Sequence, residues 1–278
     1  MNMKKFSLRS FNEPKFKMII LTGDVHTNQL KGWEQKKIGS EIKMAQRYLD
    51  ILKKYRMSCT LFINGICLDD KSEREEVKKL LEYDVELGGH TYNNFKNINI
   101  IKNYIYRKLY NCIYGSYGFQ EKDIRKTKRA FEKSGLKMTS WRTHAFGSNK
   151  ETFKILEEED VKYVSDLLGD IKPFKSNKII HVPINIPVDQ NTIAYGELKP
   201  ENRDSFASCT KGRISPEEWF EILKKRIKEN EKNKILSIIL IHPATMACLD
   251  NFKLFEKIVE FLSRYESIKM SEFNQIIN

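Results

Sequence analysis

The stretch Met18–Asn28 reads MIILTGDVHTN, a run of apolar, β-prone residues that ends in polar side chains. The same arrangement recurs along the chain, and we expect further strands at Ser58–Ile63, Asp84–Leu87, Lys137–Trp141, Val161–Ser165, Lys178–Val182 and Leu236–Ile241. Segments of helical period lie between these runs. Continuously apolar strands that alternate with helices predict an α/β fold, with a mostly parallel sheet covered by helices on both faces. The residues alone leave open whether this sheet closes into a barrel.

The expected helices are marked by their period and by their caps. The segment Ser40–Tyr55 carries apolar residues at helical spacing. A capping-box pattern at Ser72 and Glu75 predicts that a second helix begins there, and Ser215 with Pro216 at the first helical position predicts the start of another. The same reading places one more helix after the last strong strand, with Phe252, Phe255, Val259 and Leu262 in register.

The domain organisation follows from the connections. A loop of roughly thirty residues, Pro187–Arg213, is long for a compact domain, and we expect it to cover a site. The chain contains no internal repeat and no linker of biased composition, so residues 1–278 are expected to form a single domain.

Composition excludes several classes of protein. Of the 278 residues, 40% are hydrophobic and 31% charged, which is too apolar for a disordered chain and too polar for a membrane bundle. The 49 basic residues exceed the 37 acidic ones by 12, but they are spread beside glutamates along every segment, so we expect no nucleic-acid partner. The five cysteines form no CxxC pair, which argues against a disulfide framework and a zinc knuckle.

The first residues, MNMKKFSLRS, are basic but lack the apolar core of a signal peptide, and no apolar run approaches the length of a transmembrane segment. The expected location is therefore the cytoplasm.

Polar side chains follow nearly every predicted strand. Because the carboxyl ends of parallel strands lie on one rim of a barrel, these side chains are expected to meet there. Asp24 and His26 stand two residues apart, so they could converge on one ion or water, although a plain polar turn is an alternative. His90 and Asn94 stand four apart, a spacing that places both over one point if they lie on a helical turn. The other polar residues at strand ends are Asn64, Arg142, His144, Asp166 and His242.

Two of these residues suggest specific chemistry. An arginine is costly to bury alone, so Arg142 needs a carboxylate, and Asp24 on the same rim is the expected partner. His242 emerges from a strand that is too apolar to be exposed, which places it to act as a general acid near neutral pH. A buried structural histidine is the alternative, and this is the role we expect for His181 in the strand IIHVP.

Five short motifs, LTGDVHTN, TLFING, VELGGHTYNNF, SWRTHAFG and IILIHP, stand in order along the chain. Together they resemble the motifs of polysaccharide deacetylases, the carbohydrate esterases of family 4 with a NodB homology domain. The resemblance spans roughly residues 18–275. It implies a distorted (β/α) barrel with mostly parallel strands, and a metal-dependent hydrolase that removes an N-acetyl or related N-acyl group from a sugar.

The resemblance also implies a metal site with two departures. In the family, a second aspartate of the first motif and two histidines of the second motif bind the metal. Here His26 stands in place of that aspartate, His90 matches the first histidine, and Asn94 stands in place of the second. Either His26 compensates for Asn94 and a divalent metal such as Zn²⁺ is bound, or metal affinity is lost, because an amide is a poor zinc ligand.

The resemblance assigns the remaining roles by position. Asp24 matches the catalytic base, Arg142 the arginine that orients it, and His242 the histidine that protonates the leaving amine. Asp166 is expected to pair with His242 and raise its pKa, with a capping or surface role as the alternative. The residues expected to contact the substrate are Tyr92 and His144.

Three functions remain open at this point. The first is an N-deacetylase acting on a polysaccharide precursor, whose nucleotide- or lipid-linked sugar would be anionic and would suit the positive charge. The second is a deformylase or another amide hydrolase of the same superfamily. The third is a non-catalytic carbohydrate-binding protein on the same scaffold. Release of acetate, release of formate, and binding without turnover distinguish the three.

Overall fold

A computed structural model describes residues 17–30, 33–96, 100–110, 112–194 and 214–273. Its sheet consists of strands β1 (Met18–Val25), β2 (Cys59–Ile63), β3 (Val85–Gly89), β4 (Ser140–Trp141), β5 (Tyr163–Val164), β6 (Phe174–Ser176), β7 (Ile179–His181), β8 (Ser237–Leu240) and β9 (Glu266–Ser267). The helices are α1 (Trp33–Ile38), α2 (Glu41–Lys54), α3 (Ile66–Asp69), α4 (Lys71–Leu80), α5 (Ile100–Tyr110), α6 (Tyr117–Lys133), α7 (Lys150–Glu158), α8 (Pro216–Lys232), α9 (Pro243–Asp250) and α10 (Lys253–Leu262).

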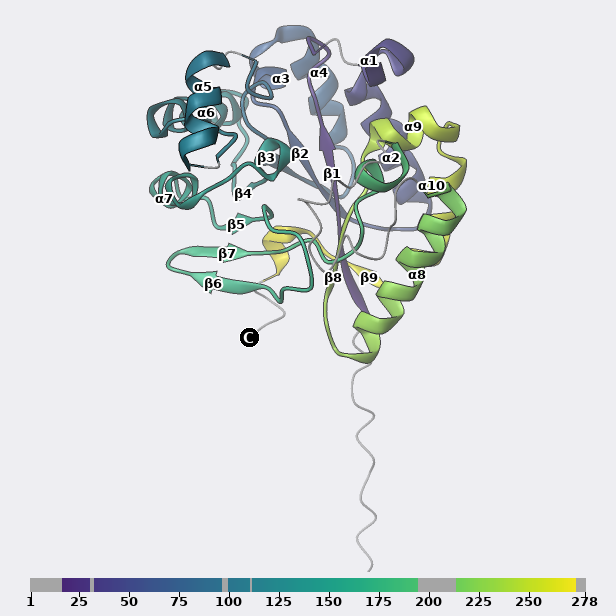
Figure 1. Ribbon diagram of the computed structural model, residues 1–278. Helices are drawn as coiled ribbons and strands as arrows, with labels where there is room; N and C mark the ends of the chain where they lie inside the picture. The colour runs from purple at the N-terminus through teal and green to yellow at the C-terminus, as the bar shows by residue number, and fades with distance from the viewer. Residues whose placement is uncertain (1–16, 31–32, 97–99, 111, 195–213, 274–278) are drawn as a thin grey trace, which may run out of the picture.

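The sheet is mostly parallel and curls into a half-barrel surrounded by helices (Figure 1). Its strand order is β6-β7-β5-β4-β3-β2-β1-β8, with β9 paired to the start of β1, and among the described strands only β6 and β7 pair antiparallel. The predicted barrel with mostly parallel strands is confirmed.

Asn185 links the segment that follows β7 to β8, the last strand in the order of this curled sheet. It follows β7 in sequence, and its backbone N–H donates to the carbonyl oxygen of Ile238 in β8 at 3.2 Å. Its side-chain oxygen accepts from the N–H of Ile238 at 2.9 Å, and its amide nitrogen donates to the carbonyl oxygen of Leu236 at 2.8 Å. The Asn185 side chain thus forms hydrogen bonds with backbone groups of Leu236 and Ile238 that would otherwise bond to the backbone of a neighbouring strand. The barrel is therefore closed at this point partly by a side chain instead of a regular strand pair, which accounts for its distortion.

Alternation along β1 divides the core into two layers. Ile19 and Leu21 belong to a large cluster shared with the outer helices. Ile20 belongs to a smaller cluster whose buried members come from strands and loops and from none of the helices α1–α10, so it fills the inside of the curled sheet. Because side chains on a strand alternate, Thr22 and Asp24 face the same way as Ile20, toward the carboxyl end of the barrel interior. The fold therefore directs the polar end of β1 into the rim.

The helix predictions are right in type and differ in detail. The predicted capping box at Ser215 is present, with reciprocal hydrogen bonds between Ser215 and Glu218. The helix predicted to start at Ser72 begins instead at Lys71, because the carboxylate of Asp70 accepts hydrogen bonds from the N–H groups of Ser72 and Glu73.

Helix α9 was not predicted. Most of its side chains are buried, so it lacks the alternation of polar and apolar faces that reveals a helix in sequence. Most of the long loop expected over the site, residues 195–213, lies outside the described residues. Among the described residues, none of the helices combines the length and the apolar run that crossing a bilayer requires.

Candidate metal centre

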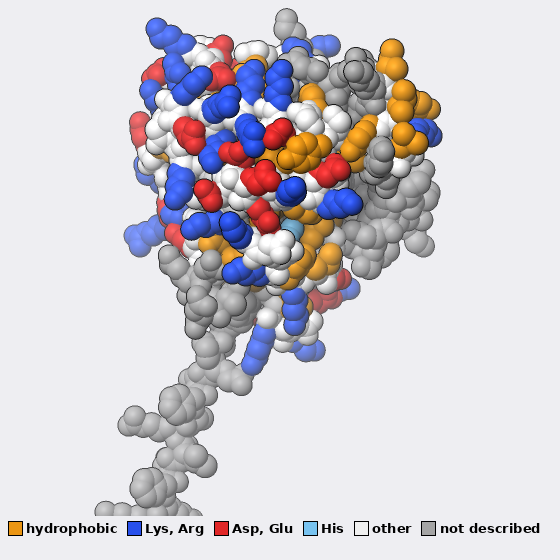
Figure 2. Space-filling model, turned by 90° about the vertical axis from the view of Figure 1, so that its left-hand side faces the viewer, with side chains coloured by type: hydrophobic (Ala, Val, Ile, Leu, Met, Phe, Trp, Pro, Cys, Tyr) orange, Lys and Arg blue, Asp and Glu red, His pale blue; other side chains and the backbone are white. Residues whose placement is uncertain are grey.

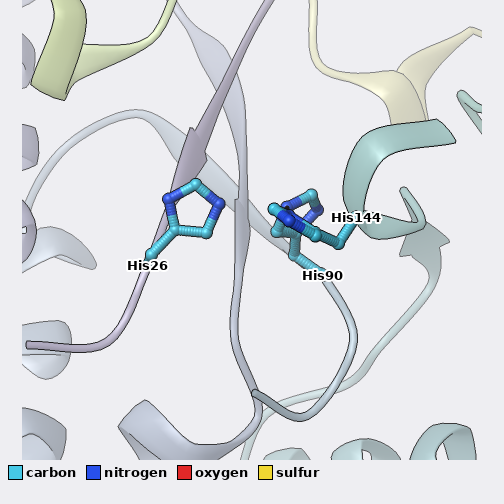
Figure 3. Close-up of side chains that lie close together, drawn as sticks. All are labelled: His26, His90 and His144. Carbon is cyan, nitrogen blue, oxygen red and sulfur yellow. Dashed lines mark hydrogen bonds between the residues drawn. The ribbon is translucent and has the colours of Figure 1, made fainter. Parts of the chain in front are cut away.

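Three histidines from separate segments lie together at the rim (Figure 3). His26 follows β1, His90 follows β3, and His144 follows β4 in a single 3-10 turn. One ring nitrogen of each lies within 4.8 Å of those of the other two. The ring centroids are separated by 5.2 to 5.5 Å. Strand ends that are far apart in the chain thus converge on one point.

His26 is held by a buried carboxylate. Glu41, at the first turn of α2, accepts hydrogen bonds through Oε2 from the backbone N–H of His26 at 2.9 Å and from its Nδ1 at 3.0 Å. Because a carboxylate of Glu41 only accepts, Nδ1 of His26 carries a proton, and in the neutral ring the lone pair is on Nε2. That Nε2 is buried and has no hydrogen-bond partner among the described residues. Burial lowers the pKa of His26, but the charge and hydrogen bond of Glu41 outweigh it and raise the pKa.

His90 is oriented by a backbone carbonyl. Its Nδ1 donates to the carbonyl oxygen of Arg142 at 2.9 Å, so its Nε2 is left as an acceptor, 3.4 Å from Nδ1 of His144. Burial lowers the pKa of His90 to about 4, despite the nearby charge of Asp24. Burial, together with His26 and His90, also lowers the pKa of His144 well below its usual value. Both rings are therefore neutral at pH 7 and offer lone pairs.

Asp24 is ion-paired as predicted. Arg142 donates from Nη1 to Oδ1 of Asp24 at 2.8 Å and is itself completely buried. Its remaining donors bond to Thr22 Oγ1 at 2.9 Å, Ser165 Oγ at 2.8 Å and the Ser165 carbonyl oxygen at 3.1 Å, while the guanidinium lies over the ring of Phe62. Burial alone would raise the pKa of Asp24, but Arg142 and the neighbouring histidines lower it well below its usual range. Asp24 is therefore a carboxylate with a fixed orientation.

His242 pairs with a residue other than the predicted one. Its Nδ1 donates to Oδ1 of Asp189 at 2.7 Å and its backbone N–H donates to Oδ2 at 2.9 Å. Its Nε2 lies 3.7 Å from Oδ2 of Asp24. Asp166, the predicted partner, instead accepts hydrogen bonds from the N–H and hydroxyl of Thr143 at 2.6 and 2.7 Å. The expected pairing of Asp166 with His242 was wrong, because Asp166 holds the backbone that precedes His144.

Asn94 and Tyr92 also lie differently from the predictions. The amide oxygen of Asn94, the atom that would bind a metal, accepts a hydrogen bond from Asn64 at 2.8 Å. Its backbone has a positive φ of 51°, so His90 and Asn94 do not share a helical turn. Tyr92, predicted to contact substrate, donates its hydroxyl to Asp69 at 2.8 Å and is mostly buried. His144, also predicted as a substrate contact, takes the place beside His26 and His90 that Asn94 was expected to fill.

A family model for polysaccharide deacetylase matches residues 12–164, more than half of the 278-residue chain. The chain belongs to the polysaccharide deacetylase family. No curated protein matches it significantly.

Solved structures match over nearly the whole chain. A polysaccharide deacetylase homologue from Mycobacterium smegmatis is 14% identical with a TM-score of 0.69, covering 95% of this chain and 91% of its own. A CE4 family pseudoenzyme from Bacillus anthracis is 17% identical with a TM-score of 0.52, covering 94% and 66%. A family 4 acetyl xylan esterase from Clostridium thermocellum, in complex with a cobalt ion, is 16% identical with a TM-score of 0.51, covering 94% and 91%. At these identities the likeness shows the fold that this polysaccharide deacetylase family member adopts.

The chemistry of the donor set in this member of the polysaccharide deacetylase family fits a divalent transition metal. Imidazole nitrogens are common ligands of Zn²⁺, and histidine ligands usually donate their second ring N–H to a carboxylate or a carbonyl. His26 and His90 have that arrangement, with Glu41 and the Arg142 carbonyl behind them. An unpartnered buried nitrogen such as Nε2 of His26 carries a free-energy cost that a bound cation would remove. The residues that could hold a metal are therefore His26, His90 and His144.

Two residues of this site escaped sequence reasoning, and a third was given no role. Glu41 looks like an ordinary acidic residue in the first turn of a helix, and Asp189 like part of a connecting loop. Asn64 was noted at a strand end without a role, although it contacts Asn94. The sequence alone does not show whether a carboxylate is buried, so Glu41 and Asp189 become recognisable only when their histidine partners are known.

The Arg142 ion pair leads to a prediction about stability. Replacing Arg142 with methionine is expected to lower the free energy of unfolding by about 3 to 5 kcal/mol, because it leaves the buried Asp24 carboxylate without its countercharge. Urea denaturation followed by circular dichroism measures this. The double variant with Asp24→Asn should recover part of the loss. As a control, Arg125→Met removes partly exposed ion pairs and should cost less than about 1 kcal/mol. A loss for Arg142→Met as small as that of the control would contradict the prediction.

Proposed function

We propose that this protein is a metal-dependent hydrolase that removes an N-acetyl group from a sugar, and that its metal is held by His26, His90 and His144. The observation that carries the proposal is the convergence of three imidazoles, those of His26 and His90 buried and that of His144 half-buried, beside the carboxylate of Asp24. Because the residues involved run from Asp24 to His242, we also propose that the chain works as the single domain expected from the sequence. A divalent cation bound there would supply Lewis acidity to water and to the acyl oxygen.

The base is proposed to be Asp24. Its Oδ1 is occupied by Arg142 at 2.8 Å, which leaves Oδ2 to accept a proton from the attacking water. Oδ2 lies 3.9 Å from Nε2 of His90, so the proton acceptor is next to the histidine cluster. Arg142 keeps the carboxylate ionised and fixes its direction.

The acid is proposed to be His242. Asp189 accepts the Nδ1 proton, so Nε2 is the nitrogen that can gain and lose a proton at the reacting centre. Nε2 lies 3.7 Å from Oδ2 of Asp24, and the two groups therefore face one another across the site. In this proposal His242 donates a proton to the leaving nitrogen as the acyl carbon–nitrogen bond breaks, and Asp189 stabilises the protonated ring that precedes this step.

Metal titration and product analysis test the proposal. Calorimetric titration of metal-stripped protein with Zn²⁺ should give a stoichiometry of about one. Fewer than about 0.1 equivalents of bound Zn²⁺ would contradict the assignment as a metalloenzyme. The Zn²⁺-loaded protein should then release acetate from oligomers of N-acetylglucosamine. Formate released from N-formylated sugars, with no acetate from the acetylated ones, would favour the deformylase alternative instead. Sugar binding without either product would favour the non-catalytic alternative.

A further inference from the structure

Helix α5 presents an exposed apolar stripe. Ile101, Tyr104, Ile105 and Leu109 are 75, 62, 51 and 69% exposed. Their spacing of three, four and eight residues from the first places them along one side of the helix. Figure 2 shows hydrophobic side chains projecting at the upper right of the face that it displays, where α5 lies. Contiguous apolar side chains on a surface usually mark a site of interaction with another molecule.

The opposite side of α5 packs against the rest of the protein. The hydroxyl of Tyr106 donates to Glu151 of α7 at 3.0 Å, and the Tyr106 ring packs against the large core cluster. The helix therefore has an inner side that fixes it and an outer side that is exposed. Eleven residues give it a length of about 16 Å.

The charged residues in the sequence of α5 and its flanks are all basic. The chain has no acidic residue between Glu86 and Glu121, and α5 itself contributes Lys102, Arg107 and Lys108. Lys108 is exposed and its Nζ lies 5.8 Å from the centroid of the Tyr104 ring, beside the apolar stripe. An apolar helix face bordered by basic residues and tyrosines is typical of helices that lie in the interface of an anionic membrane.

We propose that α5 docks on an anionic lipid surface, with Ile101, Tyr104, Ile105 and Leu109 inserted among the headgroups. The charge argues against a second copy of the chain as the occupant. Two α5 helices packed face to face would bring basic residues together with no acidic residue of the helix to offset them. A leaflet of anionic lipid offers both an apolar layer and the opposite charge.

Docking through α5 would set the substrate class, a step that rests on the proposed function. Phe95 packs against His144 of the cluster, with ring centroids 5.5 Å apart. Ile100 stands only five positions after Phe95, so α5 begins within about 18 Å of that contact. A surface seated on α5 would therefore lie near the site. The substrate inferred from this placement is a sugar carried on a lipid anchor at the membrane surface.

Vesicle sedimentation of the full-length, metal-free protein tests the docking. The protein should sediment with vesicles of phosphatidylcholine and phosphatidylglycerol in equal amounts, and much less with phosphatidylcholine alone. The double variant Ile101→Ser/Leu109→Ser should lower the partition coefficient at least about tenfold, because it removes two apolar side chains from the contact. Lys108→Glu should also weaken binding, and binding of the unsubstituted protein should fall as salt rises.

The matched control is Leu81→Ser/Ile171→Ser, which alters two exposed hydrophobic residues outside α5 and should leave sedimentation unchanged. Circular dichroism establishes whether each variant folds. If the double variant does not fold, the Lys108→Glu variant alone tests the docking. Three outcomes would overturn the proposal: no sedimentation with anionic vesicles, equal loss in the control, or a dimer in solution that the α5 variants dissociate. Zinc titration and acetate release measured without vesicles are unaffected by the α5 variants, so failure of the docking and failure of the hydrolase assignment are distinguishable.

Discussion

Replacing His144 with alanine is expected to lower the affinity of the protein for Zn²⁺ at least about 100-fold. His144 supplies one of three imidazoles whose nitrogens lie within 4.8 Å of one another, and among the residues that the structure describes no carboxylate belongs to that set. A site with two neutral ligands retains little of the affinity of a site with three, because each imidazole replaces a water of the ion. Calorimetric titration of metal-stripped protein measures the change directly and does not depend on knowing the substrate.

Asn94→Ala is the matched control for His144→Ala. The Asn94 oxygen accepts a hydrogen bond from Asn64, so its removal should change Zn²⁺ affinity by no more than about threefold. Glu41→Gln should lie between the two, with a loss of about tenfold, because Glu41 acts on the metal only through His26. If Asn94→Ala abolished binding while His144→Ala retained it, the amide would be the third ligand after all.

The fold was predictable because it is encoded in patterns of many residues. Continuous apolar strands separated by helical segments require a covered parallel sheet, and the alternation of Ile20, Thr22 and Asp24 fixes which side chains face the barrel interior. The pairing of Asp24 with Arg142 was predictable for a similar reason. A buried arginine needs a carboxylate, and the shared rim supplies that one.

The third histidine of the cluster was not predictable, because its position depends on local backbone conformation. The argument for Asn94 assumed a helical turn, whereas Asn94 and Phe95 both have positive φ angles, of 51° and 62°. The turn that presents His144 contains Ala145 and Phe146 at 53° and 54°. Neither alanine nor phenylalanine favours this conformation, so the sequence contains no signal for it. Single residues in unusual conformations redirect the side chains next to them.

The carboxylates behind the histidines depend on tertiary structure in another way. Glu41 lies 15 residues from His26, and Asp189 lies 53 residues from His242. Nothing in the spacing of either pair is specific, since both contacts are made only after helix α2 and the loop following β7 pack at the rim. Asp166 was the better candidate in sequence because it follows a strand directly, as catalytic residues in barrels often do.

Asp24→Asn is expected to lower acetate release from N-acetylglucosamine oligomers about 1000-fold or more in the Zn²⁺-loaded protein. The amide oxygen can still accept the hydrogen bond from Arg142, which keeps its other bonds to Thr22 and Ser165, so the variant should fold, with a loss of stability because the buried guanidinium loses its countercharge. Asparagine cannot take a proton from water, which removes the proposed base. Calorimetry should find Zn²⁺ affinity nearly unchanged, since the three imidazoles remain. Loss of activity with metal retained separates a base from a ligand.

Asp166→Asn is the comparison that makes this result specific to Asp24. Both are buried carboxylates at the rim. Asp166, however, accepts its hydrogen bonds from Thr143, and among the described residues no hydrogen bond joins it to His242 or Arg142. Burial raises the pKa of Asp166 to about 6, so near pH 5 the carboxyl is largely protonated and already resembles the amide. Asp166→Asn should therefore keep at least about a tenth of the activity. Equal losses in the two variants would return Asp166 to the catalytic set, and an active Asp24→Asn variant would remove Asp24 from it.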